Sequence, residues 1–234
     1  MFSVAILAGG LATRLRPITQ TIPKALVDVA GKPFIFRQLG HLREQGVSHI
    51  VLCVGYLGDM VRDVVGDGKK FGVKVSYSED GPSLLGTGGA LTKAMPLLGN
   101  QFFVLYGDSF LSVNFSAVQE AYEKSEQPAL MTVLKNQNQW DKSNVLYADG
   151  RLLEYNKHQP RAEMTHVDYG LGVVSASALG QRPVGQSFDL ADVYRDLSLR
   201  GQLAGFEVFE RFYEIGSLTG LREAEDYFLL KEQL

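Results

Sequence analysis

The chain has 234 residues, of which 45% are hydrophobic and 21% charged, and its formal net charge is −3. This composition is typical of a globular protein that buries a full core, and the length suits one α/β domain. The slightly negative charge argues against a general nucleic-acid-binding surface. The single cysteine, Cys53, excludes an internal disulfide and a cysteine-based metal cluster, and its apolar neighbours predict a core position.

No apolar stretch approaches the roughly 20 residues of a membrane span, and the N-terminus lacks the basic segment of a signal peptide. We therefore expect a cytoplasmic protein that binds neither membrane nor nucleic acid. Short apolar runs alternate with amphipathic segments, which indicates βαβ units and a largely parallel sheet. Strands are predicted over residues 4–7, 49–54, 73–77, 102–106, 129–134, 145–147, 152–155, 167–174, 203–209 and 212–215, the last two closing the sheet. Helices are predicted over residues 33–45, 57–65, 87–97, 113–125, 190–199 and 218–230.

The first 33 residues carry the most informative pattern. The apolar strand Val4–Leu7 runs into the string A-G-G-L-A-T-R-L-R-P over residues 8–17. A strand that ends in glycines lets the backbone approach a ligand, with amide N–H groups free to bind phosphate oxygens. Arg14, Arg16 and Lys24 add positive charge within the same segment. These features predict a polyphosphate site, although neither the P-loop string nor the dinucleotide fingerprint is present.

Two later strings add candidate ligands. Tyr106-Gly107-Asp108 places a carboxylate just beyond the carboxyl end of an apolar strand, where open α/β sheets bind their ligands. Such a carboxylate suits Mg²⁺, which binds one or two carboxylates together with phosphate oxygens. The string L-L-G-T-G-G-A-L over residues 84–91 forms a second glycine loop, which opens a helix and lets a flat base lie against the backbone.

Together these strings resemble the signature of the sugar-1-phosphate nucleotidyltransferase family. The match runs from Leu7 to Thr19 and continues through Pro23–Leu26 and Gly31–Pro33, with Ala12 where the family usually has glycine. The short-form bacterial enzymes that activate heptose or mannose 1-phosphate with GTP are the most similar members. The resemblance implies a Rossmann-like three-layer α/β sandwich with a mixed, mostly parallel sheet and an added β-hairpin for the sugar site. It also implies one domain over residues 1–234, with an NTP-binding half to about residue 110 and a sugar-phosphate-binding half beyond it.

The resemblance further implies a role for each matched residue. The expected catalytic residues are Arg14 for the leaving pyrophosphate, Lys24 for the reacting phosphates, and Asp108. Nucleotide binding is expected at Leu7, Ala8, Gly9, Gly10, Thr13, Arg14, Gly86, Thr87, Gly88 and Gly107. The expected Mg²⁺ ligands are Asp108 and Glu214, the latter one methylene longer than the aspartate of the family's F-x-D-I-G-T-P string. The sugar phosphate is expected at Asn156, Lys157, Asp168 and Gly170.

The implied reaction joins an NTP and a sugar 1-phosphate into an NDP-sugar and pyrophosphate. The resemblance to the short-form enzymes favours GTP with heptose or mannose 1-phosphate. The Asp168 carboxylate favours a neutral sugar, because it accepts hydrogen bonds from sugar hydroxyls and repels an acidic sugar. The alternatives are a uridylyltransferase for N-acetylmuramic acid 1-phosphate and a thymidylyl- or uridylyltransferase for a hexose 1-phosphate. A phosphocholine cytidylyltransferase and a non-catalytic nucleotide-sugar sensor stay open, the sensor because of Ala12 and Glu214. A homodimer is also left open.

Overall fold

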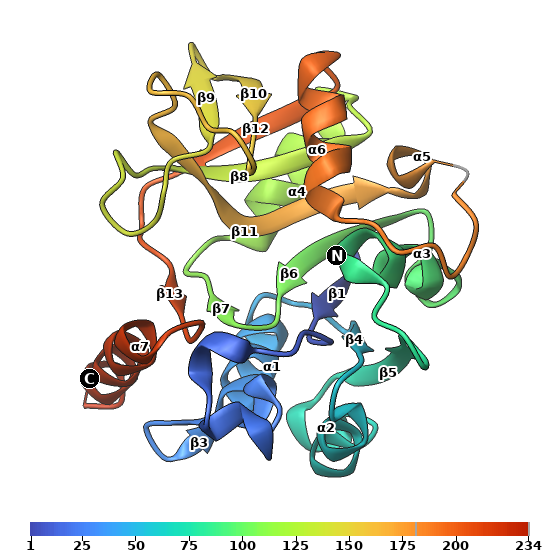
Figure 1. Cartoon of the computed structure of the whole chain (residues 1–234), viewed down its shortest axis with the longest axis vertical. Helices are drawn as coiled ribbons and strands as arrows, with labels where there is room; N and C mark the ends of the chain where they lie inside the picture. The colour runs from blue at the N-terminus through green and yellow to red at the C-terminus, as the bar shows by residue number, and fades with distance from the viewer. Residues whose placement is uncertain (181, 234) are drawn as a thin grey trace.

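The computed structural model describes residues 1–180 and 182–233 (Figure 1). Within these residues the central sheet has nine strands, whose main path runs in the order β10-β9-β11-β6-β1-β4-β5, while β8 pairs with β11 and β12 pairs with β8. The strands are β1 (Ser3–Leu7), β4 (His49–Val54), β5 (Lys74–Glu79), β6 (Gln101–Tyr106), β8 (Ala129–Lys135), β9 (Val145–Ala148), β10 (Arg151–Tyr155), β11 (His166–Ser175) and β12 (Leu203–Val208). Among them only β10 and β11 run against the others, so the sheet is mixed and mostly parallel, as predicted.

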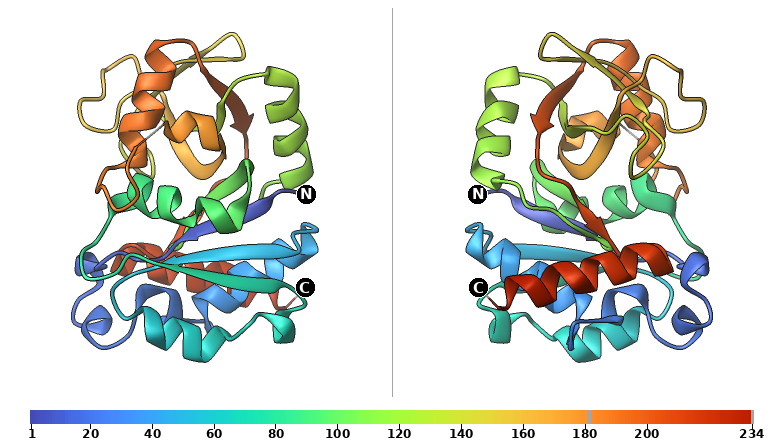
Figure 2. Two further views of the ribbon diagram at one scale, coloured as in Figure 1. Left: turned by 90° about the vertical axis from the view of Figure 1, so that its right-hand side faces the viewer. Right: turned by 90° about the vertical axis from the view of Figure 1, so that its left-hand side faces the viewer.

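Helices cover both faces of this sheet (Figure 2). They are α1 (Phe34–Glu44), α2 (Gly58–Val65), α3 (Gly86–Leu98), α4 (Phe115–Ser125), α5 (Ala176–Leu179), α6 (Leu190–Leu199) and α7 (Leu218–Lys231). Because successive side chains of a strand point to opposite faces, β1 feeds two cores. Val4 and Ile6 join the core under α1, α2 and α4, whereas Ala5 joins the core under α3, α5 and α6. The predicted three-layer α/β fold is confirmed.

The single cysteine belongs to the second of these cores. Cys53 lies among buried residues of α3 and the sheet, and burial raises the pKa of its thiol to about 12. A thiol with so high a pKa is a packing group and not a nucleophile. The predicted core position of Cys53 is confirmed.

Several short elements lie outside the nine-stranded sheet. They are the 3₁₀ helices η1 (Thr13–Leu15), η2 (Ile18–Gln20), η3 (Lys24–Leu26) and η4 (Lys69–Phe71), and the short strands β2 (Asp28–Val29), β3 (Lys32–Pro33), β7 (Ser109–Phe110) and β13 (Tyr213–Glu214). The prediction that residues 212–215 close the sheet is wrong. β13 pairs instead with β7, outside the nine-stranded sheet, because Ile215 packs into a third apolar cluster with Phe110 and Phe228.

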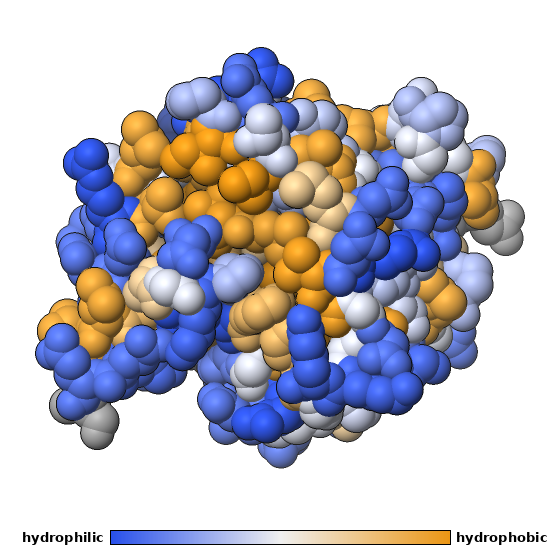
Figure 3. All heavy atoms as spheres, turned by 90° about the horizontal axis from the view of Figure 1, so that it is seen from below, coloured by the Kyte–Doolittle hydropathy of each residue, from blue (hydrophilic) through white to orange (hydrophobic). Residues whose placement is uncertain are grey.

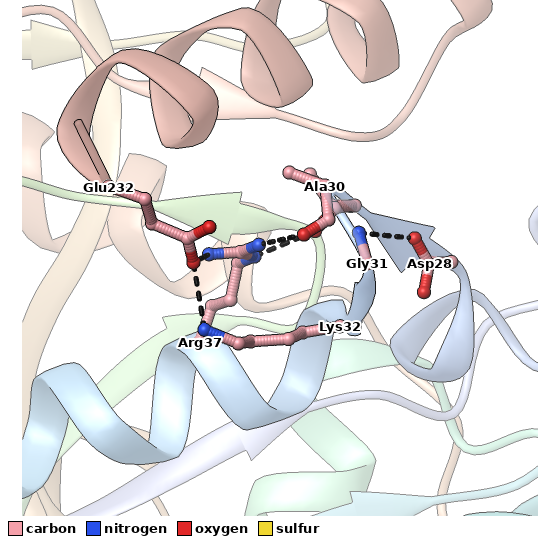
Figure 4. Close-up of polar contacts among 7 residues, drawn as sticks. Asp28, Ala30, Gly31, Lys32, Arg37 and Glu232 are labelled. Atoms are coloured by element: carbon pink, nitrogen blue, oxygen red, sulfur yellow. Dashed lines mark hydrogen bonds and ion pairs between the residues drawn. The ribbon is translucent and has the colours of Figure 1, made fainter.

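Arg37 and Lys32 attach the end of the last helix to the β2–β3 hairpin, and Lys32 Nζ lies 2.8 Å from Glu232 Oε1 (Figure 4). The Arg37 guanidinium donates to the Val29 carbonyl at 2.8 Å, to the Ala30 carbonyl at 2.7 Å and to Glu232 Oε1 at 3.1 Å. It also lies 4.2 Å from the centre of the Phe228 ring.

Apolar side chains gather on the face seen from below, on which α1 and α2 lie (Figure 3). The exposed large apolar residues of η2, the segment after it and α2 are Ile18, Ile22, Met60 and Val64.

None of the helices in residues 1–180 and 182–233 is long and apolar enough to cross a membrane.

Candidate active site

A cavity of about 240 Å³ opens where β1 and β6 end. Parallel strands end at the same edge of a sheet, so this edge brings the front loop, the Gly107-Asp108 turn and the second glycine loop together. The cavity is lined by Leu7, Ala8, Gly9, Gly10, Lys24, Ala25, Asp80, Leu84, Gly86, Thr87, Tyr106, Gly107 and Asp108. Most of the residues predicted to bind the nucleotide therefore line one cavity.

The glycines of this edge serve two different purposes. A side chain on Gly107 would place its Cβ 2.7 Å from the Leu7 carbonyl oxygen, and one on Gly9 would place it 3.1 Å from the Gly55 nitrogen. These two glycines are thus required by the close packing of neighbouring strand ends. A Cβ on Gly10 would meet no atom within 4 Å. Gly10 is therefore the glycine whose backbone is free to approach a ligand.

The front loop is held in place by its own residues and by the segment before α2. Ala12 has φ 47° and ψ 43°, the left-handed conformation in which glycine is favoured. Its carbonyl accepts a hydrogen bond from Thr19 Oγ1 at 2.7 Å, and Tyr56 Oη donates to the Gln20 carbonyl at 3.0 Å. Ala12 thus adopts a backbone conformation that favours glycine, the residue that the family usually has at this position. Thr13, at the start of η1, is exposed and is not among the residues that line the cavity, so its role stays a prediction.

Lys24 and Asp108 form an ion pair at the cavity. Lys24 Nζ lies 2.8 Å from Asp108 Oδ2, and each side chain is about one-fifth exposed. Lys24 reaches Asp108 because η3 lies beside the end of β6, far away in sequence. The pair supplies a cation and a hard oxygen ligand at one point of the cavity.

Glu214 reaches the same point through β13. It lies opposite Ser109 in the β7–β13 pair, and the Ile215 amide donates to the Asp108 carbonyl at 2.9 Å. A Cβ added to Gly216 would lie 3.2 Å from Arg14 Nη2, 3.4 Å from Asp108 Oδ2 and 3.4 Å from Glu214 Oε2. Arg14, Asp108 and Glu214 therefore converge around Gly216.

The two carboxylates repel each other. Burial raises the pKa of Glu214, and the neighbouring Asp108 carboxylate raises it further, while Arg14 and Lys24 oppose the rise. Across residues 1–180 and 182–233 there is no group of three or more histidine, cysteine, aspartate or glutamate side chains that could hold a metal ion. Two carboxylate ligands are the set that Mg²⁺ uses when phosphate oxygens and water complete its coordination.

The predicted acceptor residues lie around β10 and β11. Asp168 Oδ1 accepts a hydrogen bond from the Gly170 amide at 3.0 Å, and Gly170 has φ +101°, where β11 shifts its register against β8. Burial raises the pKa of Asp168 to about 6, although the Gly170 amide and Lys157 lower it. Asp168 in turn contributes, after burial, to the raised pKa of Tyr106, which lines the cavity. Asp168 is thus a partly buried carboxylate close to the nucleotide cavity.

The other residues that were predicted to bind the acceptor differ in their surroundings. Asn156 is buried, and its Oδ1 accepts from the Gln159 amide at 2.9 Å, which stabilises a turn. Lys157 is half exposed, and its Nζ lies 2.9 Å from Asp189 Oδ2. Asp189 also accepts from Thr87 Oγ1 at 2.6 Å and is absent from the residues predicted from sequence. Its place before an amphipathic helix marks it as an N-cap, but no local pattern indicates its contact with Lys157.

Gly88, which was predicted to bind the nucleotide, lies under the segment before α6. A Cβ on Gly88 would lie 2.1 Å from Phe188 Cε2, and its amide donates to the Phe188 carbonyl at 3.0 Å. Gly88 is not among the residues that line the cavity, so its role in nucleotide binding stays a prediction.

Residues 3–143 match the family model described as nucleotidyl transferase, and the chain belongs to that family. The resemblance found in the sequence is confirmed. The chain is similar to the N-acetylmuramate alpha-1-phosphate uridylyltransferase of Neisseria meningitidis, with 43% identity over 113 residues that cover 48% of this chain and 49% of that protein. It is 28% identical to the mannose-1-phosphate guanyltransferase beta-B of Xenopus laevis over 92% of this chain and 62% of that one.

A third relative is the D-glycero-alpha-D-manno-heptose 1-phosphate guanylyltransferase of Campylobacter jejuni, 32% identical over 62% of each chain. The chain thus spans between about half and three-fifths of the length of these curated relatives. Among solved structures, HddC from Yersinia pseudotuberculosis complexed with GMP-PN superposes with a TM-score of 0.80 and 25% identity, covering 97% of this chain and all of that one.

Proposed function

We propose that this chain transfers a nucleotidyl group from an NTP to a sugar 1-phosphate, releasing pyrophosphate. The observation that carries the proposal is the convergence of Arg14, Asp108 and Glu214 around Gly216, beside the Lys24–Asp108 ion pair at a glycine-lined cavity. Cations and a pair of carboxylates at one point suit a reaction between two phosphate anions. The family membership of the chain supports the same reaction.

The residues act by alignment and by neutralising charge. A sugar phosphate already carries its nucleophile as an oxyanion, so the site needs no strong general base. Lys24 holds the reacting phosphates together, and Arg14 holds the leaving pyrophosphate. Lys157 binds the acceptor phosphate. Asp108 and Glu214 hold Mg²⁺, which supplies Lewis-acid stabilisation of the phosphoryl oxygens when it is bound.

For the substrates, we propose GTP and heptose or mannose 1-phosphate. The similarity to guanylyltransferases for mannose and heptose 1-phosphates supports this pair. Asp168 supports a neutral sugar, because a carboxylate with a pKa of about 6 is mostly ionised at neutral pH and repels an acidic acceptor. The nucleotide would occupy residues up to about 110, and the sugar phosphate the rest. A cytoplasmic location and a homodimer stay predictions.

A second candidate is a uridylyltransferase for N-acetylmuramic acid 1-phosphate. It is favoured by the 43% identity to the Neisseria protein, although that alignment covers 48% of this chain. For this substrate the Asp168 carboxylate would have to be protonated or turned away from the lactyl carboxylate.

Pyrophosphate release tests these proposals. Each of four NTPs is paired with mannose, manno-heptose, glucose and N-acetylmuramic acid 1-phosphates, and with phosphocholine. We expect the highest kcat/KM for GTP with mannose or manno-heptose 1-phosphate. A higher kcat/KM for UTP with the muramic substrate would favour the second candidate, and no release with any pair would contradict the proposed activity.

A further inference from the structure

The segment before α6 crosses the start of α3 and connects the two substrate regions (Figure 1). The Gly88 amide donates to the Phe188 carbonyl at 3.0 Å, and the Phe188 amide donates to the Leu85 carbonyl at 3.1 Å. Asp189 follows Phe188 and caps α6 by accepting from the Ala191 amide at 3.0 Å. Asp189 is therefore held rigidly against the second glycine loop.

One oxygen of Asp189 binds that loop. Thr87 Oγ1 donates to Asp189 Oδ1 at 2.6 Å and accepts from the Leu190 amide at 2.8 Å. A hydroxyl group can donate one hydrogen bond, and the Thr87 hydroxyl donates it to Asp189. The side chain of Thr87 thus fixes the loop at the cavity that Thr87 lines.

The other oxygen of Asp189 binds the lysine predicted for the acceptor phosphate. Lys157 Nζ lies 2.9 Å from Asp189 Oδ2. An ammonium group has three N–H donors, so this contact leaves two for a phosphate. Burial raises the pKa of Asp189, but hydrogen bonds from Thr87, Ala191 and Lys157 outweigh it, and the net pKa lies below the ordinary range. Asp189 is ionised at neutral pH and attracts Lys157.

We propose that Asp189 is a positioning residue that joins the nucleotide loop at Thr87 to the acceptor-binding Lys157. The inference rests on the proposed function, since it assigns Lys157 to the acceptor phosphate. The two oxygens of Asp189 separate its two tasks: Oδ1 fixes Thr87 and the start of α6, and Oδ2 orients the Lys157 ammonium. Asp189 sets the distance between the two substrates because both regions are attached to one rigid carboxylate.

The substitution Asp189→Asn separates these tasks. Its amide oxygen still accepts from Thr87 and Ala191, whereas its NH₂ group faces the Lys157 ammonium and cannot accept a hydrogen bond. We expect the KM for the sugar 1-phosphate to rise about threefold to fivefold, the scale of a partly exposed ion pair. The KM for the NTP should stay within about twofold of the wild-type value, because Thr87 keeps its partner.

The matched control is Asp192→Asn, which removes a carboxylate from the same turn of α6. Asp192 lies 3.4 Å from His158 Nε2, and both side chains are more than half exposed. We expect its KM values to equal those of the wild type. A double mutant adds a second readout: in a Lys157→Ala background, Asp189→Asn should cause no further rise in the acceptor KM, because the residue it orients is gone.

All variants are measured by pyrophosphate release with the substrate pair that the wild type uses best. An acceptor KM of Asp189→Asn that equals that of Asp192→Asn, or falls below the wild-type value, overturns the inference. The inference is also overturned if Asp189→Asn raises the acceptor KM by the same factor in the Lys157→Ala background as in the wild type. That result would show that Asp189 acts only through the stability of the fold. An inactive wild type would instead overturn the proposed function, and the inference with it.

Discussion

Charged side chains have different surroundings in two regions of the molecule. The first region lies around β1 and β6, and the second lies around β10, β11 and α6. In the first, backbone glycines line the cavity, and Lys24 and Asp108 face each other 2.8 Å apart. In the second, side chains carry the polar contacts, and Asp168 is a carboxylate whose pKa burial raises to about 6. In the proposed function, the first region binds the phosphates of every substrate pair. The second region contains a carboxylate that titrates near neutral pH and would face the sugar.

This difference separates the chemical step from the choice of acceptor. Substitutions around β1 and β6 should slow every substrate pair alike, because they remove charges that the phosphates require. Substitutions around β11 should change the ranking of acceptors. The loss of activity in Asp108→Asn tests this separation directly, and the smaller expected effects test the individual charges of the two regions.

Asp108→Asn should lower kcat by a factor of about 100 or more, the usual loss when a charge-stabilising group is removed. The amide keeps the shape of the side chain but loses the charge that binds Mg²⁺ and pairs with Lys24. Steady-state pyrophosphate release measures the loss with at least two acceptors. An unequal loss for the two acceptors would break the separation of the regions, and a loss below about tenfold would contradict the role of Asp108.

Lys24→Ala and Arg14→Ala should each cost about 10- to 100-fold in kcat/KM, as expected for hydrogen bonds to charged groups. The two substitutions should affect kcat and KM differently. Lys24→Ala should lower kcat more than it changes KM, because Lys24 acts on the reacting phosphates. Arg14→Ala should raise the KM for the NTP. A raised KM for the NTP in Lys24→Ala, together with a lowered kcat in Arg14→Ala, would show that the two roles are exchanged.

Asp168→Asn should stabilise the protein above pH 7 and leave its stability near pH 4 almost unchanged. The pKa of Asp168 is raised from 3.8 to about 6 in the folded state. Ionisation therefore opposes folding, and stability is lost as the pH rises through this range. A shift of this size corresponds to about 3 kcal/mol at most, and partial solvent access reduces it to about 1–2 kcal/mol. Urea unfolding at pH 4 and pH 8 measures it. A variant that is less stable at pH 8 would refute the burial of this charge.

Glu214→Gln should raise the Mg²⁺ concentration for half-maximal rate by a few fold, since one of two carboxylate ligands becomes neutral. Glu214→Asp should remain active. Titration of the rate with Mg²⁺ compares both variants with the wild type. Identical titrations for all three would leave Glu214 with a structural role only.

Local patterns were sufficient to predict the sheet, because its apolar runs and the glycine strings are short and contiguous. They also placed Lys24, Asp108 and Glu214 in one site through the resemblance to the family. They failed for β13, which leaves the sheet because Ile215 packs against Phe110 and Phe228. They also gave no sign that Gly88 lies under Phe188, about a hundred residues further on, because such a contact joins distant parts of the chain. Asp189 was missed for the same reason: a helix cap is visible in sequence, but its pairing with Lys157 is not.

The most direct test of the proposed reaction follows phosphorus NMR signals of GTP and mannose 1-phosphate mixed with the wild-type protein. We expect pyrophosphate and an NDP-sugar diester to appear one for one with Mg²⁺ present, and neither to appear after chelation. Asp108→Asn should give both at a rate lower by about 100-fold. If mannose 1-phosphate gives no product, the acceptor that the substrate panel ranks highest replaces it. Pyrophosphate without an NDP-sugar, or product formation that survives full chelation, would contradict metal-dependent nucleotidyl transfer at this site.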